Sequence, residues 1–269
     1  MGGMVLTQNF LKSRTSTRDF KEEKLSNDLI EKLNKEMSDS ALKHGEEDIN
    51  FALLTNCEEV YQKLQGFAGY KGIMIKAPAY IALNTLNNKP ETYVKAAYAM
   101  EELITKLNEL SLGNCWITLS EVSEEIKKSA LKYENGDVSI LLAIGYPMDE
   151  SLKEHKYYDR LANSDLVYLD NFNQAASDED LEQRGLSSIF DYAKYAPSAY
   201  NSQPWRFLIE GDKLSIYIKD YAGTVNLIDA GIIMYYIDEL GKTIASNSKW
   251  DINPVLDAKE YTFIASKNL

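Results

Sequence analysis

The chain has 269 residues, of which 45% are hydrophobic and 11% aromatic, so it can bury a substantial core and is not a disordered protein. Its formal net charge of −12 disfavours nucleic acids and anionic membranes as partners, because the field of the protein would repel both. The longest apolar runs are too short to span a bilayer, and the N-terminal stretch lacks the apolar core of a signal peptide, so we expect a cytoplasmic protein.

The first half of the chain alternates helix and strand patterns. In order, we expect a helix over residues 25–37, a strand over 49–56, a helix over 58–68, a strand over 77–85, a helix over 93–113, an extended piece over 114–119, a helix over 123–133 and a strand over 138–147. Ser26 is a candidate N-cap for the first helix. The helix over 93–113 is apolar nearly all round its first half, which predicts a central position, and it ends at Gly113.

The second half repeats this kind of pattern after an interruption. Residues 169–183 are acidic, polar and without a period, which predicts a linker. After it we expect a helix over 185–196, strands over 206–211 and 213–218, a helix over 226–244 and a strand over 261–266. Placing Ile189 on Leu33 also places Phe207 on Phe51, which indicates a divergent internal repeat; the competing interpretation is chance alignment of two ordinary helix–strand units. We therefore expect two half-domains, 1–168 and 184–269.

The cysteines and histidines give no sign of a metal or disulfide framework. Cys57 and Cys115 have no framework spacing, which indicates a reducing compartment and structural roles. His44 and His155 supply no zinc-ligand spacing, and neither lies near a nucleophile motif. We therefore expect no metal site and no Ser-His-Asp triad.

Residues 13–20, SRTSTRDF, set two arginines around three hydroxyl residues. Guanidinium groups bind phosphate oxygens in pairs, and hydroxyl groups complete the shell around them. In an acidic protein this local cationic cluster is a candidate phosphate site. The competing interpretation is a charged N-terminal loop.

Residues 196–205, APSAYNSQPW, form the second unusual stretch. Prolines at both ends predict a stiff turn, which carries Ser198, Asn201 and Gln203. Amide and hydroxyl side chains held in this way can hydrogen-bond to the edge of a heterocycle. The competing interpretation is an ordinary helix-to-strand turn, and we assign Trp205 to the core in either case.

Together the two stretches resemble the FMN-dependent nitroreductase family. Further similar stretches are APAYIAL at 77–83, LGNCWITL at 112–119 and LLAIGYP at 141–147, so that the resemblance covers most of residues 7–168 and part of 181–269. It implies an α+β fold in which each half-domain has a mainly antiparallel sheet packed by helices. Tyr70 stands where many members have an asparagine near the flavin ring, so that contact is not carried over.

The order of the motifs departs from the usual pattern. Ordinary members carry both motifs in the same half, and two chains form two sites. Here the arginine motif lies in the first half and the Pro-Ser motif in the second. This resembles a single-chain tandem form, in which two fused halves imitate the family dimer and one site remains, so that a monomer suffices for one site.

The resemblance implies a set of cofactor-binding residues. Phosphate and ribityl contacts fall on Arg14, Thr15, Ser16 and Arg18, ring-edge contacts on the backbone of Thr118, Leu119 and Ser120, a further phosphate contact on Arg160, and ring or ribityl contacts on Pro197, Ser198, Ala199, Asn201 and Gln203.

The implied activity is that of an oxidoreductase. NADH or NADPH would deliver hydride to N5 of FMN, and a small acceptor such as a nitroaromatic or a quinone would then be reduced. No general acid stands out in the sequence, so the flavin would carry the chemistry. The alternatives are a non-catalytic flavin-binding or degenerate protein of this fold, and a helix-rich protein without a cofactor in which the motifs are coincidental.

Overall fold

The computed structural model describes residues 10–11, 14–148, 159–242, 248–257 and 259–269, and it divides the chain into two compact units. Unit 1 contains Met1–Arg14, Tyr93–Tyr98 and Tyr157–Leu269, and unit 2 contains Thr15–Thr92 and Ala99–Lys156. Neither unit is one continuous stretch, so the division differs from the boundaries expected from the sequence.

Unit 2 is built on a four-stranded antiparallel sheet. Its strands are β1 (Ile49–Leu54), β2 (Ala79–Thr85), β3 (Gly113–Thr118) and β4 (Asp137–Gly145), in the order β1-β2-β4-β3. All seven residues of β2 are buried. A strand buried on both faces needs cover on both sides, and the helices of the unit supply it.

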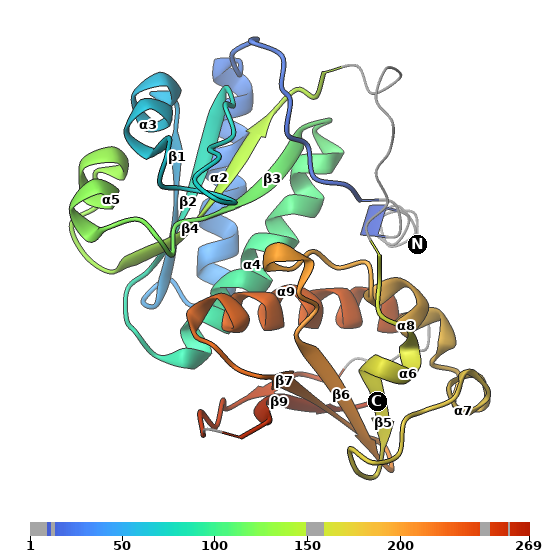
Figure 1. The fold of residues 1–269 in the computed structure, drawn as a ribbon. Coiled ribbons are helices and arrows are strands. Elements are labelled where there is room, and N and C mark those ends of the chain that lie inside the picture. Colours follow the sequence, from blue (N-terminus) through green and yellow to red (C-terminus); the bar gives the residue numbers. More distant parts are fainter. Residues whose placement is uncertain (1–9, 12–13, 149–158, 243–247, 258) are drawn as a thin grey trace. The chain divides into compact units, whose positions relative to one another are not determined.

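Two short helices, α3 (Cys57–Leu64) and α5 (Glu124–Leu131), lie together over one face of this sheet (Figure 1). Val60 and Leu64 of α3 pack in one core with residues of the sheet that include Tyr80 and Leu141. Ser123 caps α5 by accepting a hydrogen bond from the amide of Ile126. The helices expected at 58–68 and 123–133 are therefore present, somewhat shorter than predicted.

The long helix α2 (Asn27–His44) begins at Ser26, whose side chain accepts a hydrogen bond from the amide of Leu29. The predicted N-cap is therefore confirmed. At the other end of α2, Lys43 and His44 contact the two carboxylate oxygens of Glu102, at 2.5 and 2.6 Å. Glu102 belongs to the part of α4 (Pro90–Glu109) that lies in unit 2, so this ion-pair cluster joins α2 to α4.

Helix α4 ends four residues before the glycine that was expected to end it. The amides of Ser111 and Leu112 return to the carbonyls of Asn108 and Leu107, and Ser111 takes a left-handed φ of 58°. This is a Schellman motif with serine in the position that glycine usually takes. Gly113 is instead the first residue of β3.

Unit 1 contains a five-stranded sheet in the order β5-β6-β7-β9-β8. Its strands are β5 (Val167–Leu169), β6 (Trp205–Glu210), β7 (Lys213–Lys219), β8 (Asp251–Ile252) and β9 (Tyr261–Asn268). The pair β5–β6 is parallel, and the other pairs are antiparallel. Trp205 is fully buried at the start of β6, as expected.

The helices of unit 1 are α6 (Asn163–Leu166), α7 (Asp178–Gln183), α8 (Ser187–Ala193), the 3₁₀ turn η2 (Ala199–Asn201) and α9 (Thr224–Gly241). Helix α7 lies within the expected linker and begins with a capping box between Ser177 and Asp180. Almost every residue of α9 is buried, and Figure 1 shows it along one face of the sheet. The helix expected over 226–244 is therefore present as a core helix of unit 1.

Helix α9 crosses the short segment Tyr93–Tyr98 of the same unit at very close range. A β-carbon on Gly231 would lie 2.2 Å from the carbonyl oxygen of Val94, so only glycine allows this approach. Further along α9, Asp238 accepts hydrogen bonds from Tyr98, Trp250 and Lys267.

The two sheets share one strand order. In unit 2 the order is β1-β2-β4-β3, and in unit 1, after the extra strand β5, it is β6-β7-β9-β8. In both units a helix precedes the first of these strands, and a long helix separates the second from the third. Unit 1 has no helix in the positions of α3 and α5 among its described residues; Phe172 instead stacks on Tyr261 and packs against Tyr217.

The structure has the α+β architecture expected from the sequence, with two mainly antiparallel sheets. In the part of the chain that the structure describes, no helix is both long enough and apolar enough to cross a bilayer.

Candidate functional site

Arg160, in the coil before α6, is half-buried, and its hydrogen-bond acceptors among the described residues are both neutral. Its guanidinium donates to Oδ1 of Asn201 and, at 3.5 Å, to the carbonyl oxygen of Tyr195. Its Nε is buried and has no hydrogen-bond partner among the described residues. Burial lowers the pKa of Arg160, and the nearby positive charge of Arg14 lowers it further. Two guanidinium groups whose charges act on each other favour an anion, because an anion relieves their repulsion.

The APSAYNSQPW stretch forms a turn with an unusual backbone. Tyr200, Asn201 and Gln203 have positive φ values of 55°, 55° and 46°. Side chains other than glycine tolerate this region poorly, and each such residue raises the energy by roughly 1 kcal/mol or more. Strain of this kind persists only where the surroundings hold it, and it is concentrated at functional sites.

Hydrogen bonds tie this turn to residues 159–161. The side chain of Gln203 accepts from the amide of Leu161 at 2.9 Å and donates to the carbonyl of Asp159 at 3.4 Å. Asn201 donates to the same carbonyl at 3.0 Å. Gln203 is only 5% exposed, and in this conformation its side-chain amide is used in hydrogen bonds that hold the turn against residues 159–161. The expected contact of Gln203 with a ring stays a prediction.

Asp229 on α9 contacts the turn, and no motif in the sequence pointed to it. It is 2% exposed, and its Oδ1 accepts the amide hydrogen of Ala199 at 3.0 Å. Its Oδ2 is buried without a hydrogen-bond partner among the described residues. The signal in the sequence was present: one acid interrupts the apolar run around it, and a helix buried all round has no solvated face for a carboxylate.

In unit 2, residues 15–18 are anchored at the start of β3. The amide of Thr17 donates to the carbonyl of Asn114 at 2.8 Å. Just beyond, the amide of Lys21 donates to the carbonyl of Tyr146, at the end of β4. Thr15 and Arg18 are exposed, and Ser16 is half-buried, so all three can reach a ligand.

Residues 118–120 lie at the other end of β3. The Leu119 side chain is fully buried, so at this residue only the backbone is available to a ligand. The hydroxyls of Thr118 and Ser120 are 3.1 Å apart. The carbonyl of Thr118 accepts the amide hydrogen of Gly69, which precedes the tight turn between Tyr70 and Ile73. Tyr70 is 55% exposed there.

The expected site residues therefore fall into two sets. Arg14, Arg160, Pro197, Ser198, Ala199, Asn201 and Gln203 belong to unit 1, and Thr15, Ser16, Arg18, Thr118, Leu119 and Ser120 belong to unit 2. Within the first set, hydrogen bonds join Arg160 to the turn, and the charge of Arg14 acts on Arg160. That both sets bind the same molecule stays a prediction.

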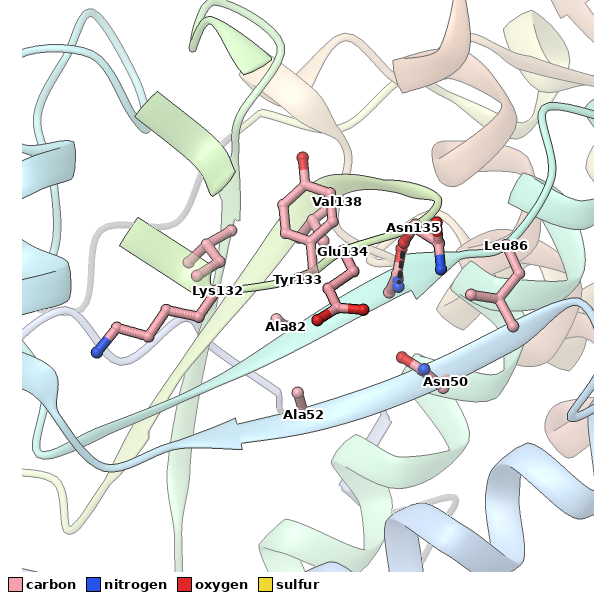
Figure 2. Close-up of a pocket in the computed structure, with 11 residues that line it drawn as sticks. Asn50, Ala52, Ala82, Leu86, Lys132, Tyr133, Glu134, Asn135 and Val138 are labelled. Atoms are coloured by element: carbon pink, nitrogen blue, oxygen red, sulfur yellow. Dashed lines mark hydrogen bonds between the residues drawn. The ribbon is translucent and has the colours of Figure 1, made fainter. Parts of the chain in front are cut away.

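A pocket of about 330 Å³ lies elsewhere in unit 2, between the strands β1, β2 and β4 and the segment that follows α5 (Figure 2). Ala52 and Ala82 are paired across β1 and β2, and because their side chains are small, space remains above them for the pocket. Asn50, Tyr133 and Glu134 supply polar groups around it. None of the site residues expected from the sequence lines this pocket.

The cysteines and histidines are the remaining reactive side chains that the sequence pointed out. Cys115 is buried, Cys57 is half-buried, and both are free thiols. Within the described residues, no three histidine, cysteine or acidic side chains cluster as metal ligands would. His155 lies outside the described residues.

Comparison with known proteins gives a match over most of the chain. The sequence matches the family model described as "Putative TM nitroreductase" over residues 7–239. No curated protein matches the sequence. A putative nitroreductase from Thermotoga maritima MSB8 has the same fold, with a TM-score of 0.59 at 17% identity over 98% of this chain and 93% of that one.

Two shorter proteins align with part of the chain. An FMN-dependent nitroreductase from Clostridium difficile R20291 is 24% identical and covers 61% of this chain and 98% of its own, with a TM-score of 0.45. A nitroreductase with bound FMN from Bacteroides fragilis NCTC 9343 is 16% identical and covers 57% and 94%, with a TM-score of 0.47.

Proposed function

Because the chain belongs to the nitroreductase family, we propose that it is an FMN-dependent oxidoreductase that takes electrons from NADH or NADPH. The proposed acceptor is a small nitroaromatic, quinone or similar molecule. When bound, FMN supplies the hydride chemistry, and the protein supplies binding, orientation and a dry environment.

The observation that carries the proposal is the half-buried charge of Arg160, whose hydrogen-bond acceptors among the described residues are neutral. The guanidinium is half-buried within range of the charge of Arg14, its acceptors among the described residues are neutral oxygens, and its Nε has no hydrogen-bond partner among them. A phosphate group would balance the charge of Arg160, because its oxygens accept charge-assisted hydrogen bonds from guanidinium groups. The terminal phosphate of FMN has the required chemistry.

The ends of β3 support a second part of the proposal. The hydroxyl-rich segment, residues 15–18, lies at the first residues of β3. Residues 118–120 lie at the last residue of the same strand and just beyond it. Asn114, which binds the first segment, and Thr118 are four positions apart along the strand, a span of about 13 Å. This arrangement suits an elongated ligand with an anionic group at one end and a flat ring at the other. The Thr15, Ser16 and Arg18 side chains would bind the former, and backbone groups of 118–120 would meet the ring edge.

We also propose that the chain is an internal repeat that imitates a dimer. The common strand order of the two sheets, with equivalent helices before the first strand and between the second and third, supports this interpretation. One FMN per chain is expected, with no second subunit required. We propose a cytoplasmic location, which the two free thiols support. The net charge of −12 supports the absence of nucleic acids and membranes among its partners.

The first test is spectroscopic. Purified protein, reconstituted with FMN and freed of excess, should absorb near ~450 nm as bound flavins do. Titration should give one FMN per chain. Replacing Arg14 and Arg18 together with alanine should abolish retention of FMN, whereas Arg184→Ala, an exposed arginine far along the sequence, should not.

The second test separates an enzyme from a binding protein. Under anaerobic conditions, NADH or NADPH should bleach the bound flavin, and an added quinone should restore the colour. Bound FMN that neither nicotinamide reduces would favour the non-catalytic alternative. A colourless protein without affinity for FMN would contradict both.

A further inference from the structure

The turn that follows α8 depends on a carboxylate from α9. Asp229 accepts the amide hydrogen of Ala199 at 3.0 Å, and this is the first residue of the η2 turn. The next two residues, Tyr200 and Asn201, both have left-handed backbones. The contact with Asp229 therefore fixes the backbone directly before the strain begins.

Other contacts hold the far side of the turn. Ser198 Oγ accepts from the amide of Gln203 at 3.0 Å, and Asn201 is bound by Arg160. Of these restraints, only the one from Asp229 reaches the turn from the long buried helix. Since α9 is packed on the sheet, it gives the turn a rigid reference, as a supporting side chain does in a preorganised site.

We propose that Asp229 is a positioning residue, which holds the Ala199–Gln203 turn in the conformation that binds the flavin. This rests on the proposed function, because the turn matters for FMN only if the protein binds FMN. The assignment concerns a residue outside both sequence motifs, and it gives the buried acid of α9 a role.

The surroundings of Asp229 determine the pH at which its carboxyl group ionises, and with it the strength of its hydrogen bond to the turn. The groups that face it are the Ala199 amide in the turn and the Asn226 side chain on its own helix, both neutral. Arg160, the charged side chain bound to the same turn, contacts Asn201 and Tyr195. Burial raises the pKa of Asp229 to about 7, against the effect of the hydrogen bonds from Ala199 and Asn226. An ionised carboxylate accepts more strongly than a protonated one, so the hold on the turn tightens as the pH rises through neutrality.

The test uses the cofactor-free protein first. In a nitrogen-15 NMR titration, the Ala199 amide should shift with a midpoint near pH 7, and in Asp229→Asn it should not shift in this range. Asn keeps an acceptor oxygen but cannot ionise. A flat Ala199 titration in the unmodified protein would overturn the assignment, whatever the outcome for FMN.

FMN binding supplies the second readout, measured by flavin fluorescence at pH 6 and 8. Asp229→Leu should raise the Kd for FMN about 10-fold, which is the loss of one buried hydrogen bond. Asp229→Asn should stay within about 3-fold of the unmodified protein and lose the part of the pH dependence that is not FMN's own.

Asp238→Asn is the matched control, since it makes the same change on the same helix at a residue bound to Tyr98, Trp250 and Lys267. It should leave both the Ala199 titration and the Kd unchanged. If Asp229→Leu does not fold, the Asn variant and the titration decide. An unmodified protein without affinity for FMN would overturn the proposed function, while the Ala199 titration would still show whether Asp229 holds the turn. Unchanged FMN affinity in Asp229→Leu would overturn the positioning role.

Discussion

A β-carbon on Gly113 would lie 2.5 Å from Oγ1 of Thr17, so the start of β3 accepts the hydroxyl-rich segment only because it has no side chain there. Gly113→Ala should push this segment away from β3. We expect a loss of about 1–3 kcal/mol in the free energy of unfolding, measured with urea, and weaker binding of FMN.

The same contact offers an internal control. All three close neighbours of the added carbon belong to the Thr17 side chain. Thr17→Gly should therefore restore most of the stability that Gly113→Ala removes, with a coupling of at least about 1 kcal/mol between the two changes. Simple additivity of the two losses would show that the contact does not position the segment.

Arg160→Met should remove the response of the protein to phosphate. Inorganic phosphate at ten times its Kd stabilises a protein that binds it only when folded by about 1.4 kcal/mol. We expect thermal unfolding to show this gain in the unmodified protein and not in Arg160→Met. Arg184→Met, at an exposed arginine that donates to the backbone carbonyl of Gly211, should keep the gain. An equal response in both variants would argue against an anion site at Arg160.

Glu102 should protect the protein against acid. Burial alone would raise the pKa of Glu102, but hydrogen bonds from His44 and Lys43 lower it to about 2. A folded-state pKa below the unfolded value stabilises the protein above about pH 4.5, and this contribution is lost as the pH falls towards 2.

Glu102→Gln should therefore cost about 1–2 kcal/mol at pH 7 and only a small part of this near pH 2.5. Urea unfolding at the two pH values checks this. Glu59→Gln is the control: the pKa of Glu59 is also lowered to about 2, but its carboxylate lies at the surface, where water screens the ion pair. A Glu59 effect as large as that of Glu102 would contradict the burial argument.

Asp229→Asn should stabilise the protein at high pH. The folded pKa of about 7 lies above the ordinary value of 3.8, so the folded state keeps a proton that the unfolded chain releases. Stability therefore falls as the pH rises between these values, and the deficit is complete above pH 7. At pH 8 the variant should be more stable by about 2–4 kcal/mol, and at pH 4 it should show no gain. Calorimetry at both values tests this; an equal gain at pH 4 would rule out relief of a buried charge.

Much of the fold could be predicted from local patterns. Ser26 caps α2 as expected, and the helices and strands of both halves lie near their predicted positions. The errors came from residues whose meaning depends on tertiary contacts. Gly113 looked like a helix terminus, but Ser111 ends α4, and the glycine is required by Thr17.

The candidate site could be predicted less completely. The motifs pointed to Arg160 and the Pro-Ser turn, and the structure joins these two by hydrogen bonds. The sequence did not indicate that Gln203 would be used within the turn, because its partners at 159–161 are distant in sequence. Asp229 was missed because a lone acid in an apolar helix has no motif, and only its contact with Ala199 gives it meaning.

The three tryptophans are divided between the two units. Trp116 donates to Glu101 in unit 2, whereas Trp205 and Trp250 belong to unit 1. Each unit therefore carries its own optical reporter. A chain that keeps only Trp116 would follow the melting of one sheet, and a chain that keeps only Trp205 would follow the other. Coincident melting curves would make the whole polypeptide a single cooperative folding unit.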